Sequence, residues 1–277
     1  MTMGNRNNIK IIHEDNHLLV VEKPPNMLTQ GDQTGDMDLL SALKEDIRQR
    51  YNKPGNVFLG LVHRLDRPVG GAMVFAKTSK AASRLSDQIR TREFDKTYLA
   101  VVHGVPDKLT GTLVNFLVKD VKTNTVRVVD SPSDMSSTVT DSAGARRQDT
   151  QNGDRDYGIH RNYGIHGNTD GNKNINAEDS YSNAKKAVLD YTVKGADDQY
   201  SLVRIKLHTG RPHQIRVQLA AAGHPLYGDQ KYGASLNKPG MQLALWSVEV
   251  GFIHPTLKEY VSFSSNPPSA YPWNLFT

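Results

Sequence analysis

The sequence predicts an α+β protein with a mixed, largely antiparallel sheet flanked by helices and loops, and with an active-site cleft on the sheet. Many short apolar runs of strand length alternate with turn-forming residues. Only a few segments space their apolar residues as a helix does. No regular alternation of strands and helices is present, and neither GxGxxG nor GxxxxGK[ST] occurs. A doubly wound nucleotide-cofactor fold is therefore not favoured.

The predicted strands are apolar and β-branched runs bounded by turn residues. The turn Glu14-Asp15-Asn16 separates the first two, and two prolines at 24–25 end the second. Residues 195–198 join two later strands into a hairpin. In chain order, strands are expected at residues 9–13, 18–22, 59–62, 72–76, 96–103, 112–118, 126–129, 187–194, 200–207, 242–250 and 259–263.

The predicted helices carry apolar residues on one face. Ser79 is the expected N-cap of the second helix. Pro212 lies near the first turn of the third helix, Gly223 ends it, and Pro225 prevents its continuation. The helices are expected at residues 38–49, 79–89 and 212–222.

Composition excludes several classes of protein. The 277 residues are 37% hydrophobic and 23% charged, which suffices for a globular core in one large or two small domains. The absence of Cys excludes disulfide scaffolds, Cys-ligated metal sites and thiol nucleophiles. The apolar runs fall far short of the roughly 20 residues that span a bilayer. Because residues 1–8 are polar, unlike a signal peptide, we expect a cytoplasmic protein.

Residues 130–183 differ from their surroundings. Only four of these 54 residues are Val, Ile, Leu or Phe, and Asp, Asn, Ser and Gly prevail. Such a segment buries too little apolar area to offset the entropy of ordering it. Its Tyr-Gly-Ile-His echo, at 157–160 and 163–166, is too short for a solenoid repeat. We expect a disordered surface insertion, with the fold continuing on either side.

The charge is unevenly spread. The chain has 34 Lys+Arg and 29 Asp+Glu, a net charge of +5, whereas residues 130–183 hold 5 basic and 9 acidic residues. The remainder therefore carries +9. A basic body suits a polyanion such as nucleic acid, although a merely soluble basic protein would have the same balance.

The densest group of reactive residues is 61–71, Leu-Val-His-Arg-Leu-Asp-Arg-Pro-Val-Gly-Gly. Asp66 lies between Arg64 and Arg67, whose charges are expected to keep it ionised. An ionised carboxylate acts as a base or a nucleophile. The Val-Gly-Gly that follows would let the backbone approach a ligand closely. A salt-bridged turn is the alternative interpretation.

A second group, residues 207–216, brings basic and imidazole side chains to a predicted helix N-terminus. Arg211 and Arg216 could meet phosphates there, or a catalytic carboxylate. His213 suits a hydrogen-bonding role better than that of an acid or base. No spacing in the sequence, such as HExxH or an EF-hand loop, predicts a metal site.

A third group is the predicted strand around Tyr98. Alternation along a strand places Lys96 and Tyr98 on one face. The Tyr98 ring could stack on a base, and its hydroxyl could exchange a proton. Packing in the core is the alternative.

Together these groups resemble the RluA family of pseudouridine synthases. The resemblance covers residues 9–129 and 187–263, and the combination of an HRLD loop with an HQIR helix is highly specific. The matching stretches are 63–67, 96–104 and 209–216, with weaker matches at 20–24, 223–229 and 232–233.

The resemblance implies a cofactor-free and metal-free isomerase. A uridine of structured RNA is flipped into the cleft, its N1–C1′ bond breaks, and the uracil rejoins through C5. Asp66 would be the catalytic nucleophile, Tyr98 would pack on the base and transfer protons, and Arg216 would pair with the aspartate. Arg64 would fill the space that the base leaves. The matching motifs imply substrate contacts from His63, Arg64, Arg67, Arg211, His213, Gln214 and Ile215.

The sequence departs from the family in two places. Many members have Thr-Ser-Gly where this chain has residues 69–71, and many begin with an S4-type RNA-binding domain. Only eight residues precede Ile9, so we expect one catalytic domain over residues 9–264, interrupted at 130–183, with no separate N-terminal RNA-binding domain. Ribosomal RNA is the first expected substrate and tRNA the second, and a monomer is expected.

Two other functions fit parts of the sequence. A catalytically idle RNA-binding protein would have the same basic body, although Asp66 and its expected partners are present. A glycosidase or nucleoside hydrolase would need two carboxylates with divided roles. Asp229 could be the second, but its Tyr-Gly-Asp setting is typical of a turn.

Overall fold

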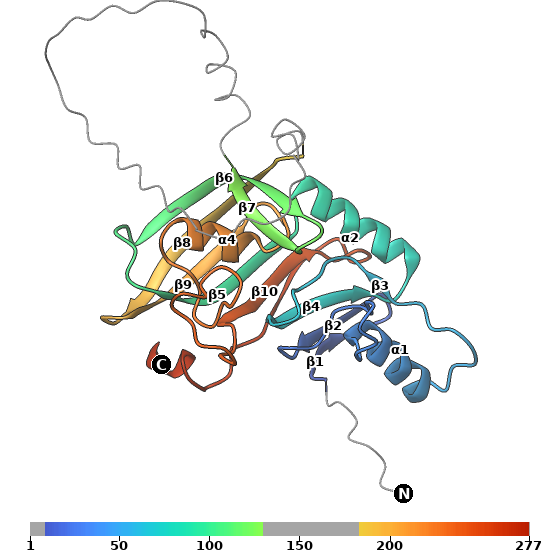
Figure 1. Cartoon of the computed structure of the whole chain (residues 1–277). Helices are drawn as coiled ribbons and strands as arrows, with labels where there is room; N and C mark the ends of the chain where they lie inside the picture. Colours follow the sequence, from blue (N-terminus) through green and yellow to red (C-terminus); the bar gives the residue numbers. More distant parts are fainter. Residues whose placement is uncertain (1–8, 130–182, 277) are drawn as a thin grey trace, which may run out of the picture.

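The structure is a computed structural model that describes residues 9–129 and 183–276, so nearly all of the predicted insertion lies outside the described residues. In this part of the chain, eleven strands form one sheet in the order β1-β2-β4-β10-β5-β9-β8-β6-β7, with β3 beside β4 and β11 beside β10 (Figure 1). The pairs are antiparallel except for β4 with β10, which is parallel. The α+β class with a mixed sheet is therefore confirmed.

Each predicted strand and helix is present, with ends shifted by a few residues. No helix in residues 9–129 and 183–276 is long and apolar enough to cross a membrane. The helices are α1 (Leu39–Arg50), α2 (Ser79–Thr91), α4 (Gln214–Ala221) and the 3-10 turn η2 (Trp273–Phe276). The strands are β1 (Ile11–Glu14), β2 (Leu18–Lys23), β3 (Gly60–Leu61), β4 (Gly70–Ala76), β5 (Asp95–His103), β6 (Thr110–Asp120), β7 (Thr125–Val129), β8 (Lys185–Ala196), β9 (Tyr200–Leu207), β10 (Leu245–Ile253) and β11 (Tyr260–Ser264).

Helix ends differ from the prediction in two places. Thr78 rather than Ser79 caps α2, because its hydroxyl accepts a hydrogen bond from the Ala81 N–H. Helix α4 begins only at Gln214, because His213 before it has left-handed backbone angles (φ 51°). The prediction for the other end of α4 is confirmed. Gly223, at φ +88°, reverses the chain after the helix.

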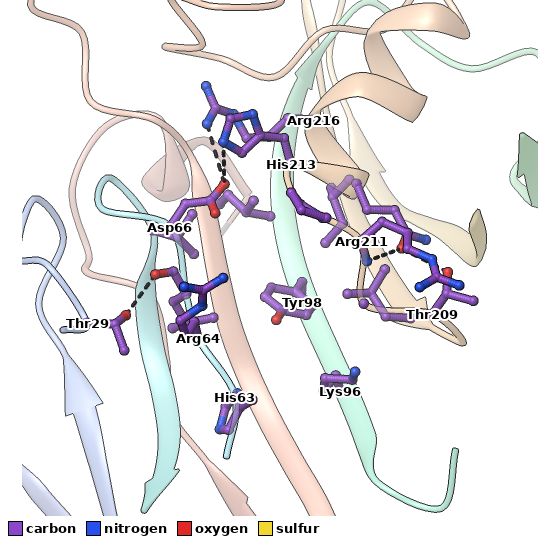
Figure 2. Close-up of a pocket in the computed structure, with 18 of the residues that line it drawn as sticks. Thr29, His63, Arg64, Asp66, Lys96, Tyr98, Thr209, Arg211, His213 and Arg216 are labelled. Atoms are coloured by element: carbon purple, nitrogen blue, oxygen red, sulfur yellow. Dashed lines mark hydrogen bonds and ion pairs between the residues drawn. The ribbon is translucent and has the colours of Figure 1, made fainter. Parts of the chain in front are cut away.

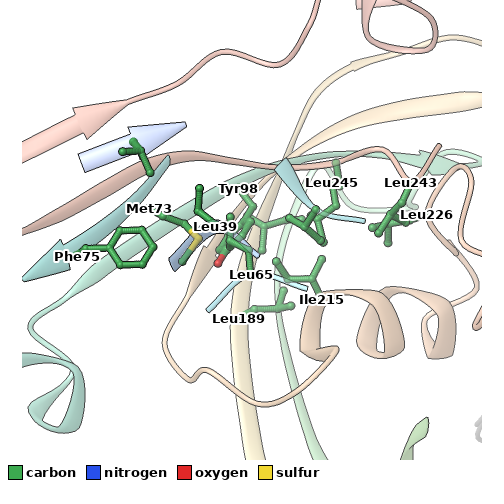
Figure 3. Close-up of a cluster of buried hydrophobic side chains, with 14 of the residues drawn as sticks. Leu39, Leu65, Met73, Phe75, Tyr98, Leu189, Ile215, Leu226, Leu243 and Leu245 are labelled. Atoms are coloured by element: carbon green, nitrogen blue, oxygen red, sulfur yellow. The ribbon is translucent and has the colours of Figure 1, made fainter. Parts of the chain in front are cut away.

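The two faces of the sheet are buried differently. One face packs under α1, α4 and the loop before β4, and its apolar cluster includes Leu39, Leu65 and Ile215 (Figure 3). On the other face, α2 packs over the β2–β4 end of the sheet through Leu85. Trp273 of the C-terminal turn packs over the middle of that second face. The first face also carries Tyr98, so the predicted site lies on this side of the sheet.

Gly70 and Gly71 pack against strand β10 and not, as predicted, against a ligand. A Cβ atom at Gly70 would overlap the Trp246 ring, and one at Gly71 would overlap the backbone of Ser247. Gly71 also has φ +115°, in the region that favours glycine. The prediction that these glycines let the backbone approach a ligand is therefore wrong. They let β4 approach β10 closely, where the two strands pair in parallel.

Candidate active site

Asp66 lies in the loop between β3 and β4, and three hydrogen bonds shape this loop. The Thr29 hydroxyl donates to the Leu65 carbonyl (2.8 Å), and the Val69 N–H donates to the Asp66 carbonyl (3.0 Å). The ammonium of Lys23 donates to the Arg67 carbonyl (3.0 Å). With Leu65 buried in the core, the loop presents the Asp66 side chain, 32% exposed, to a cleft.

Lys23 is an anchor that the sequence analysis did not single out. It is fully buried at the end of β2, and its ammonium donates to the carbonyls of Pro24, Met27 and Arg67 at 2.6–3.0 Å. Burial lowers the pKa of Lys23 to about 7, against the opposing charge of Asp66. Its three bonds tie the loop after β2 to the loop of Asp66. The only sequence signal for it was the weak family match at residues 20–24.

The structure brings Asp66 together with two predicted site residues of the 207–216 segment. Its carboxylate lies 3.5 Å from Nη1 of Arg216 and 3.9 Å from Nε2 of His213 (Figure 2). Arg216 projects from α4, and His213 immediately precedes that helix. An arginine with 8% exposure thus faces the carboxylate across the cleft. Such a cation orients the carboxylate.

Asp229 holds Arg216 in place. Its carboxylate accepts from Nε (2.7 Å) and Nη2 (2.8 Å) of Arg216, and it is completely buried. Burial by itself would lower the pKa of the Arg216 guanidinium. The hydrogen bonds that Arg216 donates to Asp229, and the charge of Asp229, outweigh this effect, so the pKa is raised. Burial likewise opposes ionisation of Asp229, yet Arg216 keeps the pKa of this carboxyl low. Asp229 is thus committed to an ion pair and is not free to act as the second carboxylate of a hydrolase.

Tyr232 completes this support. Its ring stacks on the Arg216 guanidinium, 5.3 Å from centroid to Cζ. Its hydroxyl accepts from the Val126 N–H (2.8 Å) and shares a hydrogen bond with Nδ1 of His213 (2.7 Å). The sequence signal for Asp229 and Tyr232 was the weak match at 223–233. The sequence analysis favours a turn at Asp229 over a second catalytic carboxylate, and the Lys231 and Tyr232 N–H groups do donate to its carboxylate as in a turn.

Tyr98 stands on β5 and contributes both to the core and to the cleft. Its side chain is 7% exposed, belongs to the main apolar cluster and lines the cleft near Asp66 (Figures 2 and 3). Burial raises the pKa of the Tyr98 phenol, and the charge of Asp66 adds to this effect. The hydroxyl therefore stays protonated at neutral pH. The alternative interpretation, packing in the core, is thus confirmed, whereas a role of the Tyr98 ring in the reaction stays a prediction.

The two arginines that flank Asp66 do not hold it. Arg67 turns away and pairs with Asp36 (2.8 Å) and the Asn26 carbonyl. Arg64 is exposed at the cleft, and in the described part of the chain it has no side-chain hydrogen bond or ion pair. In the part of the chain that the structure describes, neither of these two arginines forms an ion pair with Asp66. Neighbours in a loop need not point the same way, and the pairing cation comes instead from Arg216, 150 residues away.

His63 and Ile215, two predicted substrate contacts, have side chains that also belong to the interior of the protein. The His63 ring is buried, and its Nε2 accepts from the Val74 N–H (3.1 Å). Burial, with a smaller effect of Lys96, lowers the pKa of His63 to about 3, so the ring is neutral. Ile215 is buried in the apolar cluster under α4. Both line the cleft.

Gln214 and Arg211 shape the segment before α4. The Gln214 amide oxygen accepts from the Thr209 hydroxyl (2.8 Å) and the Arg211 N–H (3.0 Å), and its nitrogen donates to the Val188 carbonyl. Its polar atoms are thus occupied by the protein. Nε of Arg211 donates to the Lys186 carbonyl, and its side chain lines the cleft.

The cleft is large and basic. It has a volume of about 1660 Å³, and its lining holds ten Lys or Arg residues against three carboxylates. Within residues 9–129 and 183–276, no group of three His, Asp or Glu side chains is arranged to hold a metal ion. The cleft thus offers a polyanion positive charge, and at Asp66 a single carboxylate beside an aromatic ring.

The sequence matches the RNA pseudouridylate synthase family over residues 17–221. The chain belongs to this family, in its RluA-type branch. It is an RNA pseudouridine synthase, an isomerase, and the resemblance deduced from the motifs is confirmed.

Similar synthases cover most of the chain. A ribosomal large subunit pseudouridine synthase D of Zymomonas mobilis is 29% identical, over 94% of this chain and 69% of its own length. An uncharacterized RNA pseudouridine synthase, YjbO of Bacillus subtilis, is 30% identical over 94% of this chain and 73% of its own. The structure of human RNA pseudouridylate synthase domain containing 4 has the same fold, with a TM-score of 0.65, 22% identity, and coverage of 94% of this chain and 88% of its own.

Proposed function

We propose that this synthase modifies uridines of structured RNA, ribosomal RNA first and tRNA second, with Asp66 as its catalytic nucleophile. The observation that carries the proposal is the pairing of the Asp66 carboxylate with Arg216, beside Tyr98, inside a basic cleft. Two of the similar proteins are ribosomal large subunit pseudouridine synthases, which favours ribosomal RNA over tRNA.

The reaction rearranges one nucleoside without gain or loss of atoms. Asp66 engages the nucleoside and the N1–C1′ bond breaks. The uracil turns in the closed site, and C5 bonds to C1′. The proton on C5 leaves to solvent while N1 takes up a proton. Tyr98 packs on the uracil and, with its protonated hydroxyl, stands where it can exchange a proton. Arg216 orients Asp66 throughout.

Entry of the uridine requires base flipping, which costs a few kcal/mol. Positive charge along the cleft offsets part of this cost through contacts with phosphates. Arg64, exposed next to Asp66, fills the space that the flipped base leaves. Arg211 lines the cleft and meets the RNA backbone. One cleft contains all the groups that the reaction needs, so we propose that the enzyme acts as a monomer.

The test compares a deletion strain with strains rescued by wild type, by Asp66→Asn, or by Asp107→Asn. Asp107 lies on the exposed loop after β5 and is a matched control. Pseudouridine is mapped in total rRNA and tRNA. In parallel, purified protein acts on transcripts carrying [5-³H]uridine, which release tritium when C5 becomes bonded to C1′. We expect Asp66→Asn to lower tritium release at least ~1000-fold, as removal of a nucleophile does.

Sites restored by wild type and Asp107→Asn, but not by Asp66→Asn, would identify the substrate and the nucleophile together. Full activity of Asp66→Asn would overturn the role of Asp66. Sites confined to tRNA would overturn the preference for rRNA.

A further inference from the structure

A second charged side chain, Lys96, faces the cleft on the same strand as Tyr98. The two residues are two positions apart on β5, so about 7 Å separates their Cα atoms and both point to the same side. Lys96 is half-buried and lines the cleft. Figure 2 shows Tyr98 lying between Asp66 and Lys96. A nucleotide whose base packs on Tyr98 therefore brings its backbone within reach of Lys96.

Lys96 has no partner among the residues that the structure describes. Within residues 9–129 and 183–276, its ammonium makes no hydrogen bond and no ion pair. The neighbouring Asp95, which also lines the cleft, binds Lys206 (3.1 Å) and the Tyr260 hydroxyl (2.9 Å) and forms no ion pair with Lys96 among the described residues. The nearby His63 is neutral and provides no negative charge. Burying a cation without a partner costs free energy, and burial lowers the pKa of Lys96.

A glycine, Gly210, lies beside the ammonium of Lys96. A Cβ atom at this position would come within 3.2 Å of Nζ. A side chain at Gly210 would therefore crowd the ammonium. Because uracil is neutral, a base alone does not satisfy this charge. The anion that RNA brings into the cleft is the phosphodiester.

We propose that Lys96 binds a backbone phosphate next to the flipped uridine. This inference rests on the proposed function, because it takes RNA as the ligand and the base on Tyr98 as the point of reference. Lys96 is then a substrate-binding residue that positions the nucleotide and takes no part in the bond changes at C1′. The protein tolerates its unpaired charge because the substrate supplies the counter-charge.

The test uses Lys96→Met, which removes the charge and keeps the apolar stem, and Lys96→Arg, which keeps the charge. Lys108→Met is the control, because Lys108 is exposed on the loop after β5 and away from the cleft. The probe is an unmodified large-subunit rRNA transcript labelled with [5-³H]uridine. Binding is measured between 50 and 200 mM salt, and single-turnover tritium release is measured at saturating enzyme.

We expect Lys96→Met to bind the transcript about 10-fold more weakly at low salt. The slope of log affinity against log salt should fall in magnitude by about 0.7–1, which corresponds to one lost phosphate contact. The saturated rate should stay within about threefold of wild type. Lys96→Arg should keep the slope, and Lys108→Met should change neither quantity.

Thermal stability separates a substrate-binding role from a structural one. Removal of an unpaired, half-buried charge should stabilise the free protein, so we expect the Tm of Lys96→Met to rise by roughly 2–4 °C without RNA. If Lys96 instead stabilised the fold, its replacement by Met would lower the Tm.

An unchanged salt slope for Lys96→Met, or a lower Tm without RNA, would overturn the assignment of Lys96. Failure of the wild-type protein to release tritium from any transcript would overturn the proposed function instead. The salt slope is measured on binding alone, so the two failures are distinguishable.

Discussion

At the scale of single residues, one arginine lies between two carboxylates, and it binds one of them more tightly than the other. Asp229, fully buried, takes two short bonds from Arg216, whereas Asp66 has one longer contact of 3.5 Å and is partly exposed. The bidentate pair uses the geometry in which a guanidinium binds a carboxylate most strongly. Arg216 is thus fixed by Asp229 and still presents Nη1 to Asp66, which stays accessible from the cleft.

The first prediction concerns this division of roles. Asp229→Asn should lower the single-turnover rate by roughly 10–100-fold, because Arg216 loses its orientation and no longer holds Asp66. The free energy of unfolding should fall by about 3 kcal/mol, since a buried arginine is left without its carboxylate. The measurement is tritium release together with urea denaturation. If Asp229→Asn matched wild type in rate, Arg216 would not need this support.

A second prediction concerns pH. His63 is neutral in the folded protein, with its pKa lowered to about 3 by burial and by Lys96, whereas an unfolded chain has a histidine pKa near 6.5. The unfolded state therefore binds more protons between these values. The free energy of unfolding should fall as the pH drops from about 6.5 towards 3, by at most ~1.4 kcal/mol per pH unit from this residue.

The measurement compares wild type with His63→Gln, whose amide oxygen can still accept from the Val74 N–H. Urea denaturation at several pH values gives the two slopes. We expect the variant to have the shallower acid slope. Parallel curves would show that His63 does not carry a lowered pKa.

At the scale of elements, the loop of Asp66 is held from three sides. The loop after β2 holds it through Lys23 and Thr29, the core holds Leu65, and the start of β4 closes it with the Val69 bond. None of these contacts is visible in the local pattern of the HRLD segment. They explain why a loop, which is ordinarily mobile, presents the Asp66 side chain in a defined place.

The close approach of β4 and β10 gives a third prediction. Gly71→Ala should destabilise the protein by about 3 kcal/mol or more, because the new methyl group meets the Ser247 backbone at a positive φ. Gly55→Ala is the control: it also replaces a glycine at positive φ, but no atom lies within 4 Å of the added Cβ. Thermal denaturation of both variants measures the difference. Equal losses would show that backbone strain, and not the contact with β10, sets the cost.

At the scale of the whole molecule, the sheet order assembles the site from distant segments. The loop before β4, strand β5 and helix α4 meet on one face because β10 lies between β4 and β5. Asp66 and Arg216 are 150 residues apart in sequence, and the three matching motifs lie on these three elements. The basic lining of the cleft agrees with the positive charge of the chain outside residues 130–183.

The sequence alone determined the elements, because strands and helices follow local periods of 2 and 3.6 residues and local turn residues. All the predicted strands and helices are present, and the motifs identified the family and the three residues now placed at the cleft, Asp66, Tyr98 and Arg216.

Only the tertiary structure decided which charges meet. It paired Asp66 with Arg216 instead of Arg67, committed Asp229 to Arg216, and turned Gly70 and Gly71 towards β10. It also left the Lys96 ammonium without a hydrogen bond or ion pair in the described part of the chain. Contacts between side chains depend on distances across the sheet. Because the chain folds back on itself, these distances cannot be derived from the spacing of residues in the sequence.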